Sequence, residues 1–230
     1  MQSEVFAIAL INYVVFLFSV VCHEAAHAVV GMWGGDKTAY WNGQVTLSPV
    51  PHIRQEPFGL GLLPLISMFA AMQSGGYGII GFASAPYDPL WALRHPRRAG
   101  WMALAGPAAN LLLAAIAAIL LKVGIFAGYL NTRGVLGDDS GTAFSEAITI
   151  VLTALLFENL LLMTWNLLPI PPMDGFSALL LFVPGSKAAS LLNFRSKIGM
   201  FFPITLLVIS RFFWNVFGPF YATVNHILFG

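Results

Sequence analysis

Four long apolar runs determine how this chain can fold. They cover residues 5–33, 100–126, 144–168 and 198–217, and each reaches the length of about 20 residues with which a helix crosses a bilayer. Inside a bilayer every backbone N–H and C=O group needs a partner within the protein, so such runs fold as helices. Charged residues make up only 9% of the chain, against about 25% in soluble domains. The sequence therefore predicts an all-α polytopic membrane protein in which residues 1–230 form a single transmembrane helix bundle.

Ionisable side chains interrupt the first apolar run, in the pattern HEAAH at residues 23–27. Residues four apart share one face of a helix, so His23 and His27 can present two imidazole nitrogens to one metal ion, with Glu24 beside them. Neutral imidazoles leave the charge of zinc uncancelled, and a carboxylate that does not bind the metal can take a proton from the attacking water. The pattern predicts a hydrolytic centre with one Zn²⁺ per chain. The alternative is a buried His–Glu pair that only joins helices.

A catalytic zinc also needs a third protein ligand from elsewhere in the chain. Residues 166–175 read NLLPIPPMDG, and three prolines within four residues cannot lie inside a helix. Asp174 is thus predicted on a stiff, extended turn after the run 144–168, where a ligand would be held firmly. It could also cap the helix that restarts there. We favour Asp174 as the third ligand, and Glu158 inside the apolar run is the alternative.

The residues after the first run predict a small β-hairpin. Asn42-Gly43 lies between two β-prone stretches within residues 38–47, and Asn-Gly is the strongest short hairpin signal. Such a hairpin could dip into the site and pair with a substrate as an added strand. The alternative is an interfacial loop anchored by Tyr40 and Trp41.

The apolar segment 58–82 is broken by Pro64 and Gly75-Gly76 and decides the topology. If Asp174 is to meet the two histidines, this segment must enter the membrane and return, with its turn near Gly75-Gly76. The basic residues then divide into eight on the side of the metal centre and three opposite, namely Lys37, Arg54, Arg94, Arg97, Arg98, Lys187, Arg195 and Lys197 against Lys122, Arg133 and Arg211. The positive-inside rule places the metal centre toward the cytosol and the N-terminus outside.

Net charge and cysteine content exclude other classes of protein and site. A net charge of +1 provides no electrostatic basis for binding nucleic acid. The single cysteine, Cys22, excludes an intrachain disulfide and a cysteine-rich metal site.

Together these motifs resemble the site-2 protease family of intramembrane zinc metalloproteases (M50), in particular its short prokaryotic members without an appended PDZ or CBS domain. The resemblance covers about residues 16–185 and rests on three motifs, HEAAH at 23–27, GPAAN at 106–110 and NLLPIPPMDG at 166–175. Residues 43–49, which read GQVTLSP, and the pair Arg97-Arg98 also look like that group.

The resemblance implies that zinc is bound by His23, His27 and Asp174 and that Glu24 is the general base. It also implies that Asn110 and Asn166 line the site and hold substrate backbone or the developing oxyanion. Similar proteins cut transmembrane segments of other membrane proteins, commonly after a first cut by another protease, in regulated intramembrane proteolysis. The expected setting is the lipid bilayer of a prokaryotic cell membrane, with a transmembrane protein as the substrate.

Two other functions could use the same residues. A membrane metal-ion transporter or sensor needs a pathway of further polar residues, and the second and third runs offer few beyond Asn110, Glu158 and Asn166. A non-catalytic homologue that only binds transmembrane helices would tolerate loss of Glu24, which is present here. We therefore predict peptide-bond hydrolysis within the membrane by a zinc-bound water and Glu24. The substrate helix would be unwound locally, because a helical peptide bond is hydrogen-bonded and shielded.

Overall fold

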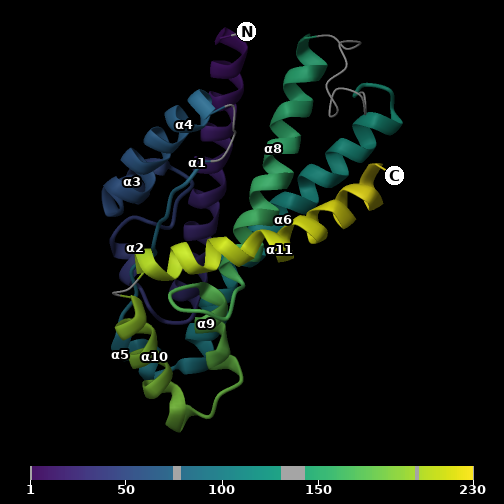
Figure 1. Ribbon diagram of the computed structural model, residues 1–230. Helices are drawn as coiled ribbons and strands as arrows, with labels where there is room; N and C mark the ends of the chain where they lie inside the picture. Colours follow the sequence, from purple (N-terminus) through teal and green to yellow (C-terminus); the bar gives the residue numbers. More distant parts are fainter. Residues whose placement is uncertain (1, 75–78, 131–142, 200–201, 230) are drawn as a thin grey trace.

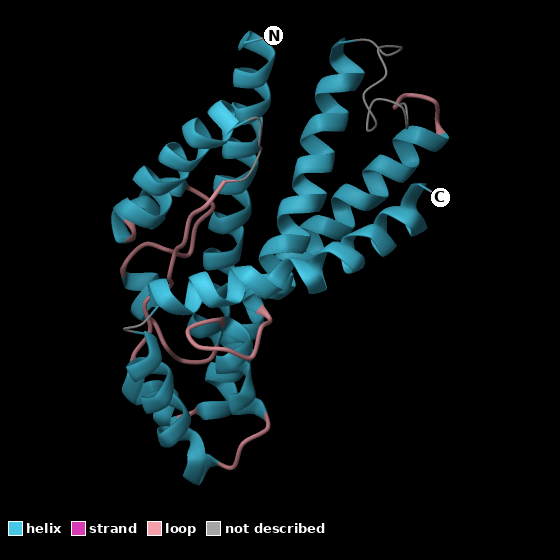
Figure 2. Ribbon diagram, in the orientation of Figure 1, coloured by secondary structure: helices cyan, strands magenta, loops and turns pink. Residues whose placement is uncertain are grey.

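The computed structural model describes residues 2–74, 79–130, 143–199 and 202–229, and within these residues all regular structure is helical (Figure 2). Three of the described helices are long and apolar enough to cross a membrane. They are α1 (Gln2–Trp33), α6 (Pro96–Phe126) and α8 (Ala143–Asn166). The predicted apolar runs at 5–33, 100–126 and 144–168 thus form helices whose ends lie within a few residues of the expected positions.

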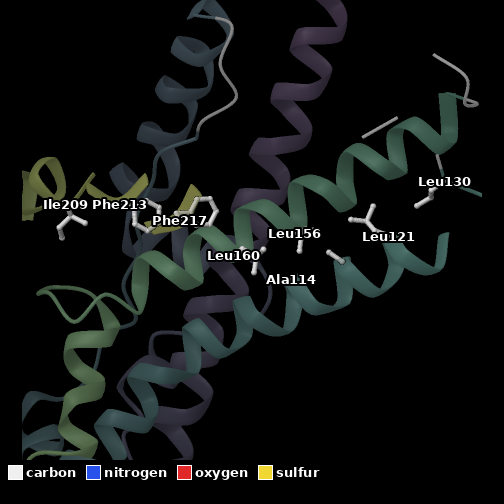
Figure 3. Close-up of a cluster of buried hydrophobic side chains, with 9 residues drawn as sticks. Ala114, Leu121, Leu130, Leu156, Leu160, Ile209, Phe213 and Phe217 are labelled. Atoms are coloured by element: carbon white, nitrogen blue, oxygen red, sulfur yellow. The ribbon is translucent and has the colours of Figure 1, made fainter. Parts of the chain in front are cut away.

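These three helices pack together as the centre of the molecule. Helix α6 packs against both α1 and α8, and the C-terminal ends of α1 and α8 lie at the same end of the bundle as the start of α6 (Figure 1). Small residues such as Ala114 and Ala117 are buried in α6 and allow close approach by Leu156 and Leu160 of α8 (Figure 3). Arg133, one of the three basic residues predicted opposite the metal centre, lies outside the described residues.

The small β-hairpin predicted over residues 38–47 is wrong, because these residues begin with a short helix, α2 (Thr38–Trp41). The Asp36 carboxylate starts it by accepting hydrogen bonds from the backbone N–H of Thr38 at 2.9 Å and from its hydroxyl at 2.6 Å. Gly43, at φ 72°, ends it, since the N–H groups of Gly43 and Gln44 donate to carbonyls one turn back, those of Tyr40 and Ala39. Asn42 keeps φ −81°, whereas the hairpin turn needs a positive φ at both central residues.

The first part of the broken apolar segment packs along α1, and its last residues return in extended form and hydrogen-bond to that first part. After α3 (Pro49–Gln55), a π-helical turn (Pro57–Leu62) leads into α4 (Leu63–Ser74), which packs against α1. The chain returns extended, with the N–H of Ile80 donating to Ser67 Oγ at 2.9 Å and that of Phe82 to the Gly59 carbonyl at 3.1 Å. The predicted turning point at Gly75-Gly76 lies outside the described residues, and the crossing of a membrane by this segment stays a prediction.

A small cap covers the end of the bundle where α1 and α8 finish (Figure 1). It consists of α5 (Pro89–Arg94), α9 (Asp174–Ala178), the 3₁₀ turn Leu179–Leu181 and α10 (Gly185–Gly199). Its core is formed by Trp91, Ala92, Ala99, Leu180 and Ala188. Arg195 of α10 donates to the Tyr87 hydroxyl at 3.0 Å and to the Pro172 carbonyl at 3.3 Å, so the cap is bonded to the proline turn.

The last helix, α11 (Phe202–Phe229), crosses α8 and α6 instead of running beside them (Figure 1). The sequence predicted a helix over residues 198–217, and the helix observed starts later and extends further. Phe213 and Phe217 of α11 belong to the same buried apolar cluster as Ala114, Leu156 and Leu160 (Figure 3).

Candidate metal centre

Three potential ligand atoms from two distant parts of the chain meet between α1 and α9. The Nε2 atoms of His23 and His27 lie 3.0 Å apart, because the residues are one helical turn from each other on α1. Asp174 opens α9, and its Oδ2 is 3.0 Å from His23 Nε2 and 3.2 Å from His27 Nε2. Both histidines are buried and the Asp174 side chain is 17% exposed. The structure therefore brings together the three residues that the sequence suggested as ligands.

The geometry of these three atoms fits a small divalent cation. Donor atoms that bind tetrahedral zinc at about 2.0–2.1 Å lie roughly 3.3 Å from one another, close to the observed separations. Two imidazoles and one carboxylate are also the donor set of many catalytic zinc sites, in which a fourth position is left for water or substrate. Within the described residues, this is the one group of three or more His, Cys, Asp or Glu side chains that could hold a metal ion.

Gly106 of α6 provides the space for this arrangement. A Cβ atom at position 106 would collide with the Nε2 atoms of both His23 and His27. The glycine of GPAAN thus allows the α6 backbone to lie directly against the imidazole edges that face Asp174. The sequence motif identified this region, but only the packing of α6 on α1 shows why a glycine stands there.

Hydrogen bonds behind the two rings fix which imidazole nitrogen faces the centre. His27 Nδ1 is 2.7 Å from the Met102 carbonyl, which can only accept, so Nδ1 carries the hydrogen and Nε2 keeps its lone pair. His23 Nδ1 lies 2.6 Å from Asn110 Oδ1, which has the same effect. Partners of this kind orient metal-binding histidines and raise their basicity.

A buried polar chain continues behind Asn110. Its Nδ2 donates to Asn159 Oδ1 of α8 at 2.8 Å, and Asn159 Nδ2 donates to Ser19 Oγ of α1 at 2.8 Å. Asn110, Asn159 and Ser19 are fully buried. Because its amide nitrogen is used by Asn159, Asn110 must turn its oxygen toward His23. Sequence reasoning missed Asn159 and Ser19; the available signal was a second amide inside an apolar run, which needs a partner.

The other predicted site residues lie in different surroundings. Asn110 lies behind His23, on the Nδ1 side of its ring. Asn166 is half-buried at the end of α8 and donates its side chain to the Leu162 carbonyl at 3.0 Å. Glu158, the alternative ligand, is buried in α8 and does not belong to the group of three. Glu24, next to His23 in the sequence, is buried, and its Oε2 has no hydrogen-bond partner within the described part of the chain.

The polar chain behind His23 leads to a prediction about metal affinity. We expect Asn159→Leu to weaken zinc binding about 10- to 100-fold, because Asn110 loses the partner that keeps its oxygen toward His23. Competition with a chromogenic chelator on the purified protein measures this. Thr153→Val is a matched control on the same helix, since the buried Thr153 hydroxyl has no hydrogen-bond partner to lose. Equal affinities in the two variants would contradict the prediction.

Comparison with known proteins agrees with this geometry. Residues 11–210 match the sequence profile of Peptidase family M50. The chain is 31% identical over 196 residues to "Putative zinc metalloprotease YwhC" of Bacillus subtilis, an alignment that covers 83% of this chain and 78% of that protein. It is also 33% identical over 164 residues to "Putative zinc metalloprotease Rip2" of Mycobacterium tuberculosis, covering 71% of this chain and 54% of Rip2. No solved structure matches. On this family match, and with a donor set suited to zinc between α1 and α9, the chain belongs to peptidase family M50, the site-2 protease family of zinc metalloproteases.

Proposed function

We propose that this protein hydrolyses peptide bonds in or near the transmembrane segments of other membrane proteins. The observation that carries the proposal is the depth of the centre within α1. His23 and His27 lie inside α1, which is long and apolar enough to cross a membrane, and about 9 Å of helix follow His27 at 1.5 Å per residue. A site at this position would be reached by a polypeptide that lies within the bilayer.

In this proposal His23, His27 and Asp174 hold one Zn²⁺ per chain. When bound, zinc supplies a nucleophile derived from water at neutral pH and polarises the carbonyl that is attacked. Glu24 follows His23 directly in the sequence and does not belong to the group of three potential ligands. Its unpartnered Oε2 takes the proton from the attacking water and passes it to the amide nitrogen as the peptide bond breaks.

The substrate must present an extended peptide bond, because hydrogen bonds inside a helix shield its carbonyls. Asn166 is our candidate for holding that extended backbone. Its amide donates to the Leu162 carbonyl of its own helix, a bond that a substrate carbonyl can replace. Asn110 remains a weaker candidate, since its side chain is already engaged by His23 and Asn159.

The proposed orientation places the N-terminus outside the cell and the metal centre toward the cytosol of a prokaryotic cell. Exposed basic side chains lie on the cap and on the first turn of α6, at the end of the bundle that holds the centre, among them Arg94, Lys187 and Lys197 of the cap and Arg97 and Arg98 of α6. A cysteine introduced at Ser186 in a Cys22→Ala background should react with a membrane-impermeant reagent only when the cytosolic face is open. Labelling of this cysteine in intact cells would show that the protein has the opposite orientation.

The experiment that tests the function uses the purified protein with a single-span membrane protein in detergent or liposomes. We expect cleavage within the span, its loss on removal of zinc with a chelator, and its return when zinc is added back. Mass spectrometry of the products locates the cut. Regulated proteolysis further predicts faster cleavage of a substrate whose external domain has been trimmed beforehand. Cleavage that persists without zinc, or that falls only in soluble segments, would refute the proposal.

A further inference from the structure

Arg195 is a half-buried cation on α10 that takes no part in the centre described so far. Its guanidinium group is always charged in proteins, and a charge removed from water is usually paired with one of opposite sign. None of the ion pairs in the described part of the chain includes Arg195. Its Nε is buried and has no hydrogen-bond partner among the described residues. A side chain that is held in such surroundings calls for a reason.

The two terminal nitrogens of Arg195 bind two segments that are far apart in the sequence. Nη1 donates to the Tyr87 hydroxyl at 3.0 Å, and Nη2 donates to the Pro172 carbonyl at 3.3 Å. The guanidinium carbon also lies 5.9 Å from the centre of the Tyr87 ring, within the range of a cation–π contact. Arg195 thus joins the segment before α5 to the proline turn.

The Pro172 carbonyl lies on the turn that carries the third potential ligand. Pro172 is two residues before Asp174 in the sequence. The turn is closed locally, because the Met173 N–H donates to the Ile170 carbonyl at 2.9 Å. The Met173 side chain is also buried. A bond that holds the Pro172 carbonyl therefore restrains Asp174 as well.

The Tyr87 hydroxyl leads back to α1, the helix that carries the other two potential ligands. Asp88 follows Tyr87, and its N–H donates to the buried Asp36 carboxylate at 2.8 Å. The Asp36 N–H donates in turn to the Gly31 carbonyl of α1 at 2.9 Å. Arg195 therefore closes a path of hydrogen bonds and short chain segments that runs from the end of α1 to the proline turn.

We propose that Arg195 is a positioning residue that keeps Asp174 close to His23 and His27 before a metal ion binds. This role rests on the proposed function, in which these three side chains hold zinc. Ligand atoms that already lie near one another lose less conformational freedom when the ion binds than atoms on segments that move independently. Removal of the two bonds of Arg195 should therefore lower the affinity for zinc and leave the reaction at a filled site unchanged.

Zinc affinity in a set of variants, measured by chelator competition, tests this role. Arg195→Met keeps a long side chain and removes both bonds, and Tyr87→Phe keeps the ring and removes the hydroxyl. We expect zinc affinity to fall about 10- to 100-fold in Arg195→Met and about threefold in Tyr87→Phe. The double variant should lie within about twofold of Arg195→Met, because both changes remove one shared bond. Lys197→Met, at an exposed position on the same helix, removes a positive charge and should bind zinc like the wild type.

Hydrogen exchange of the zinc-free protein measures the same restraint without a metal. We expect the backbone amides of residues 173–178 to exchange faster in Arg195→Met than in the wild type, and at the wild-type rate in Lys197→Met. At saturating zinc, cleavage by Arg195→Met should return to within about threefold of wild type, because mass action refills the site.

The other results overturn the inference. Unchanged zinc affinity or unchanged exchange in Arg195→Met, even with a lower Tm, means that Arg195 only supports the fold. Additive losses in the double variant mean that Arg195 does not act through Tyr87, and cleavage that stays low at saturating zinc means that it serves the reaction itself. If Arg195→Met does not fold, wild-type affinity and exchange in Tyr87→Phe overturn the inference. If affinity and exchange change as expected but no transmembrane substrate is cleaved, the role of Arg195 stands and the proposed function fails.

Discussion

Glu24→Gln is expected to lower the rate of cleavage of a transmembrane substrate about 10²- to 10⁴-fold while zinc remains bound at one ion per chain. Glutamine has nearly the shape of glutamate but cannot take a proton from water. Glu24 is not one of the three potential ligands, so the ion should stay in place. Single-turnover cleavage and metal analysis of the same preparation measure the two quantities.

Two further variants sharpen this experiment. Glu24→Asp keeps a carboxylate on a shorter side chain and should retain more activity than Glu24→Gln. Glu146→Gln, at the far end of α8, removes a carboxylate of the same kind away from the centre and should cleave like the wild type. Undiminished cleavage by Glu24→Gln would show that Glu24 takes no part in the reaction. Loss of zinc from that variant would show that Glu24 is a metal ligand.

Gly106→Ala is expected to reduce zinc affinity at least about 100-fold, although it adds only one methyl group. The new Cβ would collide with the Nε2 atoms of His23 and His27. Neither ring can turn aside freely, because Asn110 and the Met102 carbonyl hold them from behind. The helix α6 must therefore move away from α1, and overpacking of this kind commonly costs about 1–3 kcal/mol of stability as well.

The matched control for this substitution is Gly218→Ala on α11. A Cβ there would meet no atom within 4 Å, and the position is helical, so neither zinc affinity nor stability should fall. Chelator competition and thermal unfolding in the presence and absence of zinc measure both proteins. Normal zinc binding by Gly106→Ala would show that α6 does not confine the two imidazoles.

Much of the fold could be predicted because lipid restricts the choices. Long apolar runs have to be helices, and the prolines of residues 169–172 have to end one, so α1, α6 and α8 were found with nearly correct bounds. The hairpin failed because Asn42-Gly43 provides a positive φ, which serves a helix end as well as a hairpin turn. The deciding contact is a local hydrogen bond, from the Thr38 N–H to the Asp36 carboxylate at the start of α2. Residue types alone do not tell whether this hydrogen bond stabilises the chain more than strand pairing would.

The candidate site was predictable only where neighbouring residues in the sequence define it. His23 and His27 follow from helical periodicity, and Asp174 follows from the stiff turn that carries it. The contacts of Gly106 and the Asn159–Ser19 pair depend on which faces of separate helices meet. Each of these helices is apolar on all of its faces. The sequence therefore contains little periodic pattern that would indicate which face packs against the rest of the protein. Asn110 shows the consequence, because its motif was recognised but its place behind His23 was not.

Because Asp174 comes from α9 and its two companions come from α1, an ion held by all three joins segments that are about 150 positions apart in the sequence. Metal binding and the contact between α1 and α9 are thermodynamically coupled. Any change that separates α9 from α1 lowers the affinity for the ion, and the bound ion opposes that separation by the same free energy. A polypeptide that enters between these segments would therefore have to do so without parting them, or else lose the cation on which its own cleavage depends.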